Sequence, residues 1–280
     1  KLRKSYADAI IDVIYLKRNE SNDDLHLLPI DTIQTHVINI KIPFFIKWIN
    51  KVYWRMFHIS LKERYIHKRY ASYISKIHYK DYDHIFVRSS GLDYETILAT
   101  KDLPILKQAI INFHDPYPLF WYSGGKTTLS NLELFRLKAM IEVVSKAKKC
   151  ITPSSLLSND MQFLLNSDKK FFTLPHQYDK AVFNLSDNSK MVTKSKNVTI
   201  SYHGAIMFGR NIDILLDAYR ELLTANPRYV NETEFILRLR GQENKRLRSK
   251  YSNIKNISIL DTLNFSNSCL EQINQADICI

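Results

Sequence analysis

Short runs of alternating apolar and polar residues are separated by longer runs in which apolar residues recur at helical spacing. The short runs predict strands and the longer runs predict helices. In the first part of the chain we expect helices over 1–8, 44–80, 92–104 and 133–149. We expect strands over 9–17, 36–42, 85–89 and 108–114, followed by the shorter runs KCITPS and KFFTLPHQ.

The same alternation restarts after residue 196. It predicts strands at 198–203, 235–240 and 256–260, with a further strand beginning at 277. Between them, helices are expected at 211–224, 243–251 and 266–275. The first of these strands, its glycine-bearing turn and the helix that follows form half of a βαβ unit.

Strands that alternate with helices predict an α/β protein with doubly wound parallel sheets. The polar stretch 179–196 has no periodicity and is the expected linker between a first domain, 1–178, and a second, 197–280. A chain of 280 residues is near the upper limit of one core, which also favours two domains. The chain starts inside a helix and stops in a strand, so we expect the first domain to lack its first strand and the second to be incomplete.

Composition adds a strong positive charge to this outline. Forty basic and 28 acidic residues give a net charge of +12 and a pI near 9.4, which predicts anionic partners. No apolar run reaches the roughly 18 residues that a membrane-spanning helix needs. The three cysteines have no paired spacing, which argues against a zinc site or disulfide framework and favours a reducing cytosol.

Ligand sites on open α/β sheets form beyond the carboxyl ends of strands. Gly91, Gly204 and Gly241 are expected at such ends, although the chain has only six glycines. Glycine lets a ligand approach the backbone closely, but turns between strands and helices can also require it. The turn after strand 198–203 adds Arg210 just before a helix N-terminus, a combination that suits a phosphate group.

The segment FHDPYPLFWYSGG is a second concentration of chemistry. His114 ends a strand there and could donate to a sugar hydroxyl or a phosphate oxygen, while Asp115 could accept from hydroxyls. The alternative is that Asp115 caps the turn and His114 is a hydrogen-bonded core imidazole.

The order of these segments resembles glycosyltransferase family 4, which has the GT-B fold. The resemblance rests on the ordered series FHDPYP, ITPSSLLSNDM, FFTLPHQYDKAVF, ISYHGAIMFGRNIDILLDAY, FILRLRGQ and NISILDTLNFSNSCLEQINQADICI, which covers almost the whole chain. It implies two Rossmann-like domains facing across a cleft. It also implies that the family's E-x7-E segment would follow Ile280, so the fragment by itself is expected to be inactive.

The resemblance also assigns roles to individual residues. His114 matches a histidine that faces the reacting sugar, and we expect it to position that sugar, with Asp115 as the other catalytic candidate. Gly204, Ala205 and Arg210 match the turn that holds the donor diphosphate, but Ala205 stands where an arginine is common. Arg238 or Arg240 could replace that missing cation. The further candidates for donor or acceptor contacts are Gly91, Ser154, Gly241 and Arg240.

The activity implied is that of a retaining hexosyltransferase in bacterial polysaccharide biosynthesis. It would move a sugar from a nucleotide-sugar donor to a glycan or lipid-linked acceptor in the cytoplasm. No metal or other cofactor is expected, because a helix N-terminus and cations can take up the charge of the leaving nucleoside diphosphate.

Segment 44–70 has the sharpest shift in composition. From 41 to 70 there are eight Lys or Arg, eight aromatic residues and a single acid. The expected helix carries a basic stripe, formed by Lys47, Lys51 and Arg55 and continued by His58 and Lys62. Such a helix could lie on an anionic membrane at the inner face, with Trp48 and Trp54 at the interface. The alternative is a solvated basic face whose aromatic residues pack on the sheet.

Two other classes of protein stay open. A non-catalytic sugar-binding or scaffold protein with the GT-B fold would explain Ala205, and a GT-B epimerase or phosphorylase would share the sheets. Nucleic-acid binding is not expected, because no RRM, KH, helix-turn-helix or zinc-finger pattern is present.

Overall fold

The computed structural model describes residues 5–18, 20, 25, 28–89, 94–117, 128–175, 196–206, 211–239 and 241–280. The chain divides into two compact units, residues 1–177 and 178–280. Almost all of the expected linker, 179–196, lies outside the described residues.

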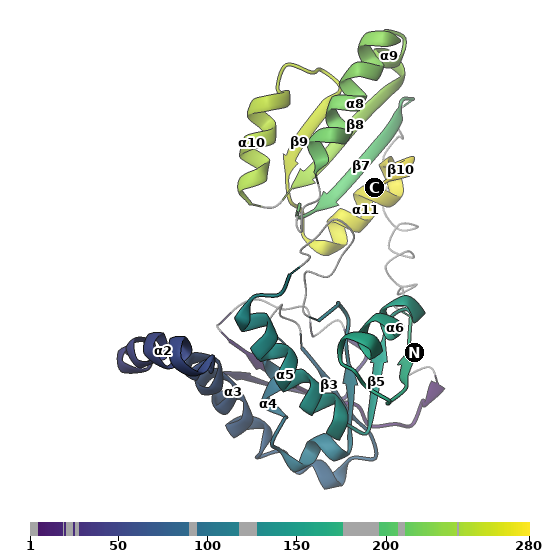
Figure 1. Ribbon diagram of the computed structural model, residues 1–280. Coiled ribbons are helices and arrows are strands. Elements are labelled where there is room, and N and C mark those ends of the chain that lie inside the picture. The colour runs from purple at the N-terminus through teal and green to yellow at the C-terminus, as the bar shows by residue number, and fades with distance from the viewer. Residues whose placement is uncertain are drawn as a thin grey trace. The chain divides into compact units, whose positions relative to one another are not determined.

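The described part of the first unit alternates strands with helices, as the periodicity predicted (Figure 1). Its strands are β1 (Asp12–Lys17), β2 (Thr32–Val37), β3 (Ile85–Arg88), β4 (Ala109–Asn112), β5 (Lys149–Thr152) and β6 (Phe171–Thr173). Its helices are α2 (Phe44–Phe57), α3 (Leu61–Ile74), α4 (Glu95–Ala99), α5 (Asn131–Lys146) and α6 (Ser155–Leu164), with 3-10 turns η2 (Tyr79–Asp81) and η3 (Pro104–Lys107).

Strands β3, β4, β5 and β6 form one parallel sheet in that order. Alternate residues of a strand point to opposite faces, so Ala109, Ile111 and Phe113 share one face, where all three are completely buried. Strands β1 and β2 pair in parallel with each other in a separate two-stranded sheet.

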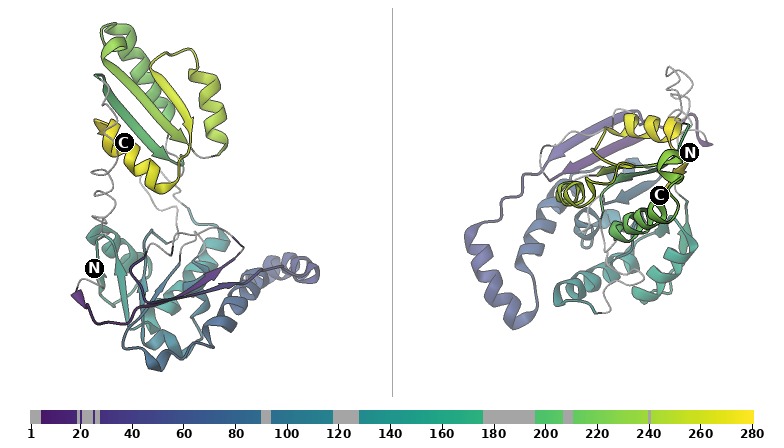
Figure 2. Two further views of the ribbon diagram at one scale, coloured as in Figure 1. Left: turned by 180° about the vertical axis from the view of Figure 1, so that it is seen from behind. Right: turned by 90° about the horizontal axis from the view of Figure 1, so that it is seen from above.

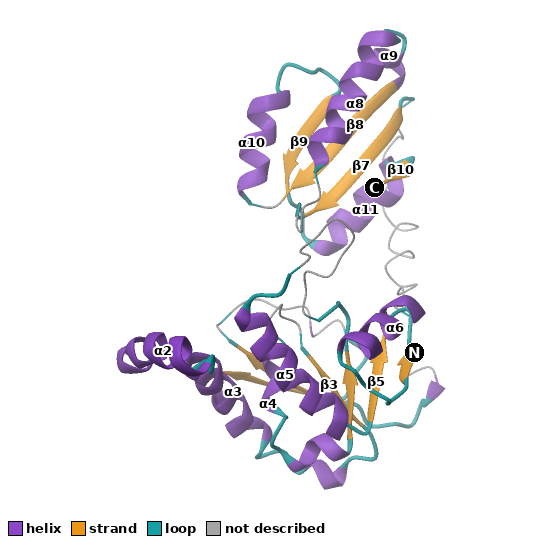
Figure 3. Ribbon diagram, viewed as in Figure 1, coloured by secondary structure: helices purple, strands orange, loops and turns teal. Residues whose placement is uncertain are grey.

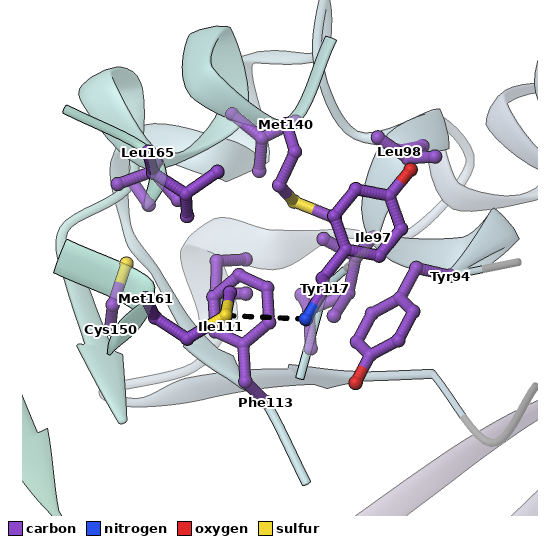
Figure 4. Packing of buried hydrophobic residues seen from close by; sticks show 14 of the residues in the cluster. Tyr94, Ile97, Leu98, Ile111, Phe113, Tyr117, Met140, Cys150, Met161 and Leu165 are labelled. Atoms are coloured by element: carbon purple, nitrogen blue, oxygen red, sulfur yellow. Dashed lines mark hydrogen bonds between the residues drawn. The ribbon is translucent and has the colours of Figure 1, made fainter. Parts of the chain in front are cut away.

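The core of the first unit fills the face of the sheet on which Ile111 and Phe113 lie (Figure 4). Met140 from α5, Met161 from α6 and Tyr94 from the start of α4 pack there. The Tyr117 N–H donates to the Met161 sulfur at 3.3 Å, which ties the loop after β4 to α6. This packing fixes the carboxyl end of β4, where the predicted catalytic residues follow.

The strand expected over 36–42 is misplaced, because β2 covers Thr32–Val37. Asn39 has a left-handed backbone, with φ 44°, and stops the ladder immediately after Ile38. The alternating isoleucines instead pack on α3 as an irregular segment, in which Ile38 is 2% exposed.

The single helix expected over 44–80 is also wrong, because it is two helices. His58 ends α2 in the left-handed conformation, with φ 53°. Ser60 then begins α3 by accepting the Glu63 N–H on its hydroxyl at 3.1 Å. A serine followed three residues later by glutamate is a helix-start pattern that the sequence prediction overlooked.

The second unit reproduces the predicted order closely (Figure 3). Its strands are β7 (Val198–Gly204), β8 (Thr233–Leu239), β9 (Ile257–Asp261) and β10 (Ile278–Cys279). Its helices are α8 (Ile212–Ala225), the short α9 (Tyr229–Glu232), α10 (Gln242–Tyr251) and α11 (Phe265–Gln275).

The sheet of the second unit is parallel, with strand order β10-β7-β8-β9. Helices α8 and α10 cover one face and α11 lies on the other, which is the doubly wound arrangement (Figure 2). Leu216, Leu237, Leu247 and Tyr251 are completely buried between the sheet and the α8–α10 layer.

Candidate functional site

His114 and Asp115 follow β4 at the carboxyl edge of the first sheet, where a site was expected. His114 Nε2 lies 3.1 Å from Asp115 Oδ2, and the imidazole stacks on the Tyr94 ring with centroids 5.7 Å apart. The Tyr94 hydroxyl donates to the Asp115 carbonyl at 2.7 Å and accepts the Asp115 N–H at 3.2 Å. Tyr94 is completely buried, and burial raises the pKa of its hydroxyl.

This arrangement gives the two residues different access to a ligand. The His114 side chain is 17% exposed, whereas that of Asp115 is 49% exposed. The Asp115 carboxylate can therefore meet a hydroxyl from solution, while the imidazole is held against Tyr94. The imidazole and carboxylate thus form one unit, and its catalytic role stays a prediction.

Ser154, a predicted contact residue after β5, is the N-cap of α6. Its hydroxyl oxygen accepts the Leu157 N–H at 3.2 Å. Behind it, a buried chain of hydroxyls joins Thr152 to Ser158 at 2.7 Å and Ser158 to Thr173 at 3.3 Å. These bonds hold the carboxyl ends of β5 and β6 together. The N-cap hydrogen bond to Leu157 by itself accounts for the Ser154 hydroxyl without a ligand.

A cavity of about 260 Å³ opens elsewhere in the first unit, and His114, Asp115 and Ser154 are not among the residues that line it. Its wall includes charged, amide and aromatic side chains from several elements: Arg18 after β1, Asn50 and Trp54 of α2, Glu63 of α3, Glu95 of α4 and Arg136 of α5. Carboxylates, guanidinium groups and an aromatic ring are the groups that bind hydroxyl-rich ligands.

Two ion pairs shape the cavity. Arg136 donates two hydrogen bonds to the Glu63 carboxylate, each 3.1 Å long, and both side chains are mostly buried, at 17% and 8% exposed. Arg18 lies 3.4 Å from Glu95. Burial and the neighbouring Glu95 carboxylate raise the pKa of Tyr70. The two carboxylates of the cavity wall are thus paired with arginines, and Lys62 adds a further cation.

Sequence reasoning missed both glutamates. Glu95 is the first residue of the helix after β3, so the search of strand ends could have included it. Glu63 is the single acid between residues 41 and 70, and that isolation was a signal. Arg136 and Arg18 carried no comparable signal, since their roles come from partners far away in the chain.

In the second unit, Gly204 and Gly241 lie at the carboxyl ends of β7 and β8. Their φ angles, 153° and 88°, are ones that residues with a side chain rarely adopt. Among the described residues, a Cβ at Gly204 would come no closer than 3.8 Å to the Tyr202 hydroxyl, and one at Gly241 would meet nothing within 4 Å. Backbone conformation, not crowding by these residues, therefore favours glycine at both positions.

Other predicted donor-side residues are only partly described. The Ala205 carbonyl accepts the Tyr202 hydroxyl at 3.0 Å, which fixes the chain just after β7. Asn211 caps α8 by accepting the Asp213 N–H on its side chain at 3.1 Å. Gly91, Arg210 and Arg240 lie outside the described residues.

Arg238, suggested as a replacement cation, already has hydrogen-bond partners inside the second unit. Its guanidinium donates to the Glu271 carboxylate at 2.6 and 2.7 Å and to the Asp261 carbonyl at 2.9 Å. The hydrogen bond to Glu271 raises the pKa of Arg238 further above its ordinary value. Arg238 and Glu271 thus form an internal ion pair that joins β8 to α11.

The same cluster holds His203, the residue before Gly204. Its Nδ1 lies 2.7 Å from the Ser268 hydroxyl and its Nε2 lies 3.4 Å from Glu271 Oε1. The His203 side chain is 5% exposed, and burial lowers its pKa below the ordinary value. A neutral imidazole therefore supports the strand end that precedes the glycine turn.

Within the part of the chain that the structure describes, no group of three or more His, Cys, Asp or Glu side chains could hold a metal ion. The described helices also include none that is both long and apolar enough to cross a membrane.

Comparison of the sequence with protein-family models and with curated proteins finds no match. Solved structures do match. The UDP-forming alpha,alpha-trehalose-phosphate synthase of Burkholderia vietnamiensis has a TM-score of 0.56 at 10% identity, over 77% of this chain and 54% of that one. The alpha,alpha-trehalose 6-phosphate synthase of Burkholderia multivorans has a TM-score of 0.55 at 10% identity, and the match covers 74% of this chain and 52% of that one.

A third match is UDP-GlcNAc 2-epimerase of Neisseria meningitidis, solved with UDP-GlcNAc, with a TM-score of 0.52 at 12% identity over 95% of this chain and 76% of that one. Together with the two parallel α/β units, these likenesses show that the chain has the GT-B fold. The chain spans about half the length of the trehalose-phosphate synthases that it matches.

Proposed function

We propose that the protein is a retaining glycosyltransferase of the family 4 kind. It would move a sugar from a nucleotide-sugar donor to a glycan or lipid-linked acceptor, without a metal ion. Acting in bacterial polysaccharide biosynthesis, it would work in the cytoplasm at the inner face of the membrane.

The observation that carries this proposal is the turn between β7 and α8. Gly204 has a backbone that only glycine adopts readily, and the 14-residue helix α8 begins a few residues later. A helix N-terminus presents amides and positive potential to a phosphate group. The fold supports the same reading, because the matched solved structures are named as UDP-forming or UDP-sugar-bound enzymes.

In this proposal different residues bind the donor and the acceptor. Arg210 and the amides at the start of α8 would bind the donor diphosphate and stabilise the charge on the leaving group. His114 and Asp115 would position the reacting hydroxyl, with a donor phosphate oxygen accepting its proton. The family pattern supports these roles, with Ala205 as the main departure from it.

Replacing Arg210 tests the donor site directly. Loss of one charge-assisted contact should weaken binding by about 1.5 to 3 kcal/mol. We expect Arg210→Ala in the full-length protein to lower the affinity for UDP-glucose or UDP-GlcNAc, measured by calorimetry. Arg220→Ala is a matched control, because Arg220 lies within α8, half exposed, beside Asp217 at 3.1 Å. Equal affinity of wild type and Arg210→Ala would contradict the proposal.

The likeness to a 2-epimerase supports a second candidate, a nucleotide-sugar epimerase, since that match covers most of both chains. Product analysis separates the candidates. A transferase releases nucleoside diphosphate only when an acceptor is present, and it keeps its rate in a chelator. An epimerase changes the sugar of the donor without an acceptor, and a scaffold protein does neither.

A further inference from the structure

Helix α2 exposes a continuous apolar stripe. Phe45, Trp48, Ile49, Val52 and Met56 are 62, 63, 40, 51 and 66% exposed, and α2 has no buried residue. Their spacing places them on one side of the helix. In every view α2 lies at the edge of the first unit (Figures 1 and 2). Large apolar side chains gathered in this way mark an interaction surface.

The other side of α2 is attached to the unit. Trp54 packs edge-on against Phe135 of α5, with centroids 6.2 Å apart, and is only partly exposed. The Asn50 side chain accepts the Lys62 N–H at 3.0 Å. The two tryptophans predicted to act together therefore have different roles, since Trp54 anchors the helix and Trp48 faces solvent. The alternative in which the aromatic residues of α2 pack on the sheet does not fit this exposure.

Cations lie along the edge of the stripe. Lys47, Lys51 and Arg55 are all exposed, at positions on α2 beside Phe44 and Trp48. The single acid of residues 41–70, Glu63, is buried and bonded to Arg136, so it does not neutralise them. The exposed surface of α2 is therefore apolar and basic, without an acidic group.

We propose that α2 is an interfacial helix that docks the protein on an anionic membrane. The apolar stripe would enter the boundary between headgroups and acyl chains, and the three cations would lie against lipid phosphates. Anionic lipid fits better than a second copy of the chain, because two such helices face to face would bring like charges together.

Docking would also place the cavity of the first unit at the membrane surface. Asn50 and Trp54 line that cavity from the attached side of α2, directly behind the apolar stripe. This step rests on the proposed function: a lipid-linked acceptor would keep its chain in the bilayer and its polar head in the cavity. Docking itself does not require glycosyl transfer, so the two ideas can fail separately.

Flotation with vesicles tests the apolar stripe. The protein should float with vesicles of phosphatidylglycerol and phosphatidylcholine, and Trp48→Glu/Val52→Glu should lower the partition coefficient by about tenfold or more. Leu156→Glu/Phe163→Glu is the matched control, because these α6 side chains are 76 and 82% exposed. The control should float like the wild type. Equal losses in the two variants, or no flotation of the wild type, would overturn the proposal.

A second set of variants tests the charges. Binding should fall between about 0.1 and 1 M salt, where the Debye length shrinks from about 10 to 3 Å, and on pure phosphatidylcholine. Lys47→Glu/Lys51→Glu/Arg55→Glu should abolish flotation, whereas Lys107→Glu/Lys138→Glu/Lys148→Glu, with the same change of net charge on exposed residues, should retain it. The oligomeric state of the same variants tests the other occupant. If the wild type is a dimer and Trp48→Glu/Val52→Glu makes it a monomer without changing flotation, the apolar stripe binds a second copy of the chain and not lipid.

Discussion

Glu63 shows how one side chain can determine the character of a surface. It lies in the first turn of α3, where a carboxylate is favoured by the helix dipole, and it also receives both hydrogen bonds from Arg136 of α5. The pair joins two helices and forms part of the cavity wall. Because the carboxylate is buried, the cations around it on α2 and α3 dominate the exposed surface.

Breaking this pair should destabilise the protein strongly. Glu63→Gln leaves the Arg136 charge buried without its partner, and we expect the free energy of unfolding in urea to fall by about 3 kcal/mol. Glu142→Gln is the control, because its side chain is 51% exposed beside Lys101 at 3.3 Å and should change stability by less than about 1 kcal/mol. Similar values for the two variants would contradict the assignment. Glu63→Leu/Arg136→Met, which removes both charges, should recover stability.

At the scale of elements, the ends of helices decide which polar residues can serve a ligand. Ser154 was predicted as a contact residue, but its hydroxyl begins α6, and Ser130 and Glu133 form a capping box that begins α5. The helix expected over 133–149 accordingly runs from Asn131 to Lys146. A polar residue at the start of a helix can therefore satisfy backbone N–H groups of that helix, as Ser154 does, even where the sequence pattern suggests a ligand contact.

The cap at Ser154 gives a prediction about stability. Ser154→Ala should lower the free energy of unfolding by about 1 kcal/mol, because the Leu157 N–H loses its acceptor. Ser154→Asp keeps an acceptor at the N-cap and should restore stability in the same denaturant titration. A Ser154→Ala protein that is as stable as wild type but binds donor or acceptor more weakly would contradict the cap assignment and support the predicted ligand contact.

At the scale of the whole molecule, each unit buries a cluster of polar groups that joins distant elements. In the second unit, His203, Ser268, Glu271 and Arg238 form a cluster that joins β7, β8 and α11. We therefore expect the stability of this unit to depend on whether the His203 imidazole is protonated, because burial lowers its pKa. In the first unit, the comparable pair, Glu63 with Arg136, has an imidazole beside it as well, since His67 Nε2 lies 3.9 Å from Glu63 Oε2.

That dependence predicts how stability changes with pH. The pKa of His203 is lowered by burial, so the unfolded chain binds the proton more readily than the folded one. The contribution of neutral His203 to the free energy of unfolding is fully present above the unfolded pKa of about 6.5. It is lost as the pH falls below that value. The difference in unfolding free energy between wild type and His203→Asn should therefore shrink on acidification, by at most about 1.4 kcal/mol per pH unit. His78→Asn, at an exposed histidine, is the control, and the same trend in both variants would contradict the prediction.

The sequence by itself determined the order of strands and helices and the parallel α/β class. It also placed Gly204 and Gly241 at strand ends and His114 beside Asp115. These features are local, because periodicity and turn chemistry act over a few neighbouring residues. The errors were local too: Asn39 ended a strand through its backbone, and His58 divided a helix.

Only the tertiary structure decided which charged groups meet and which aromatic residues face solvent. Glu63 and Arg136 are 73 residues apart, and Arg238 and Glu271 are 33 apart, so no spacing in the sequence announces either pair. Trp48 and Trp54 have the same chemistry, yet their positions on α2 send one to solvent and the other to Phe135. Partner choice depends on how distant elements pack, and packing is a property of the folded chain.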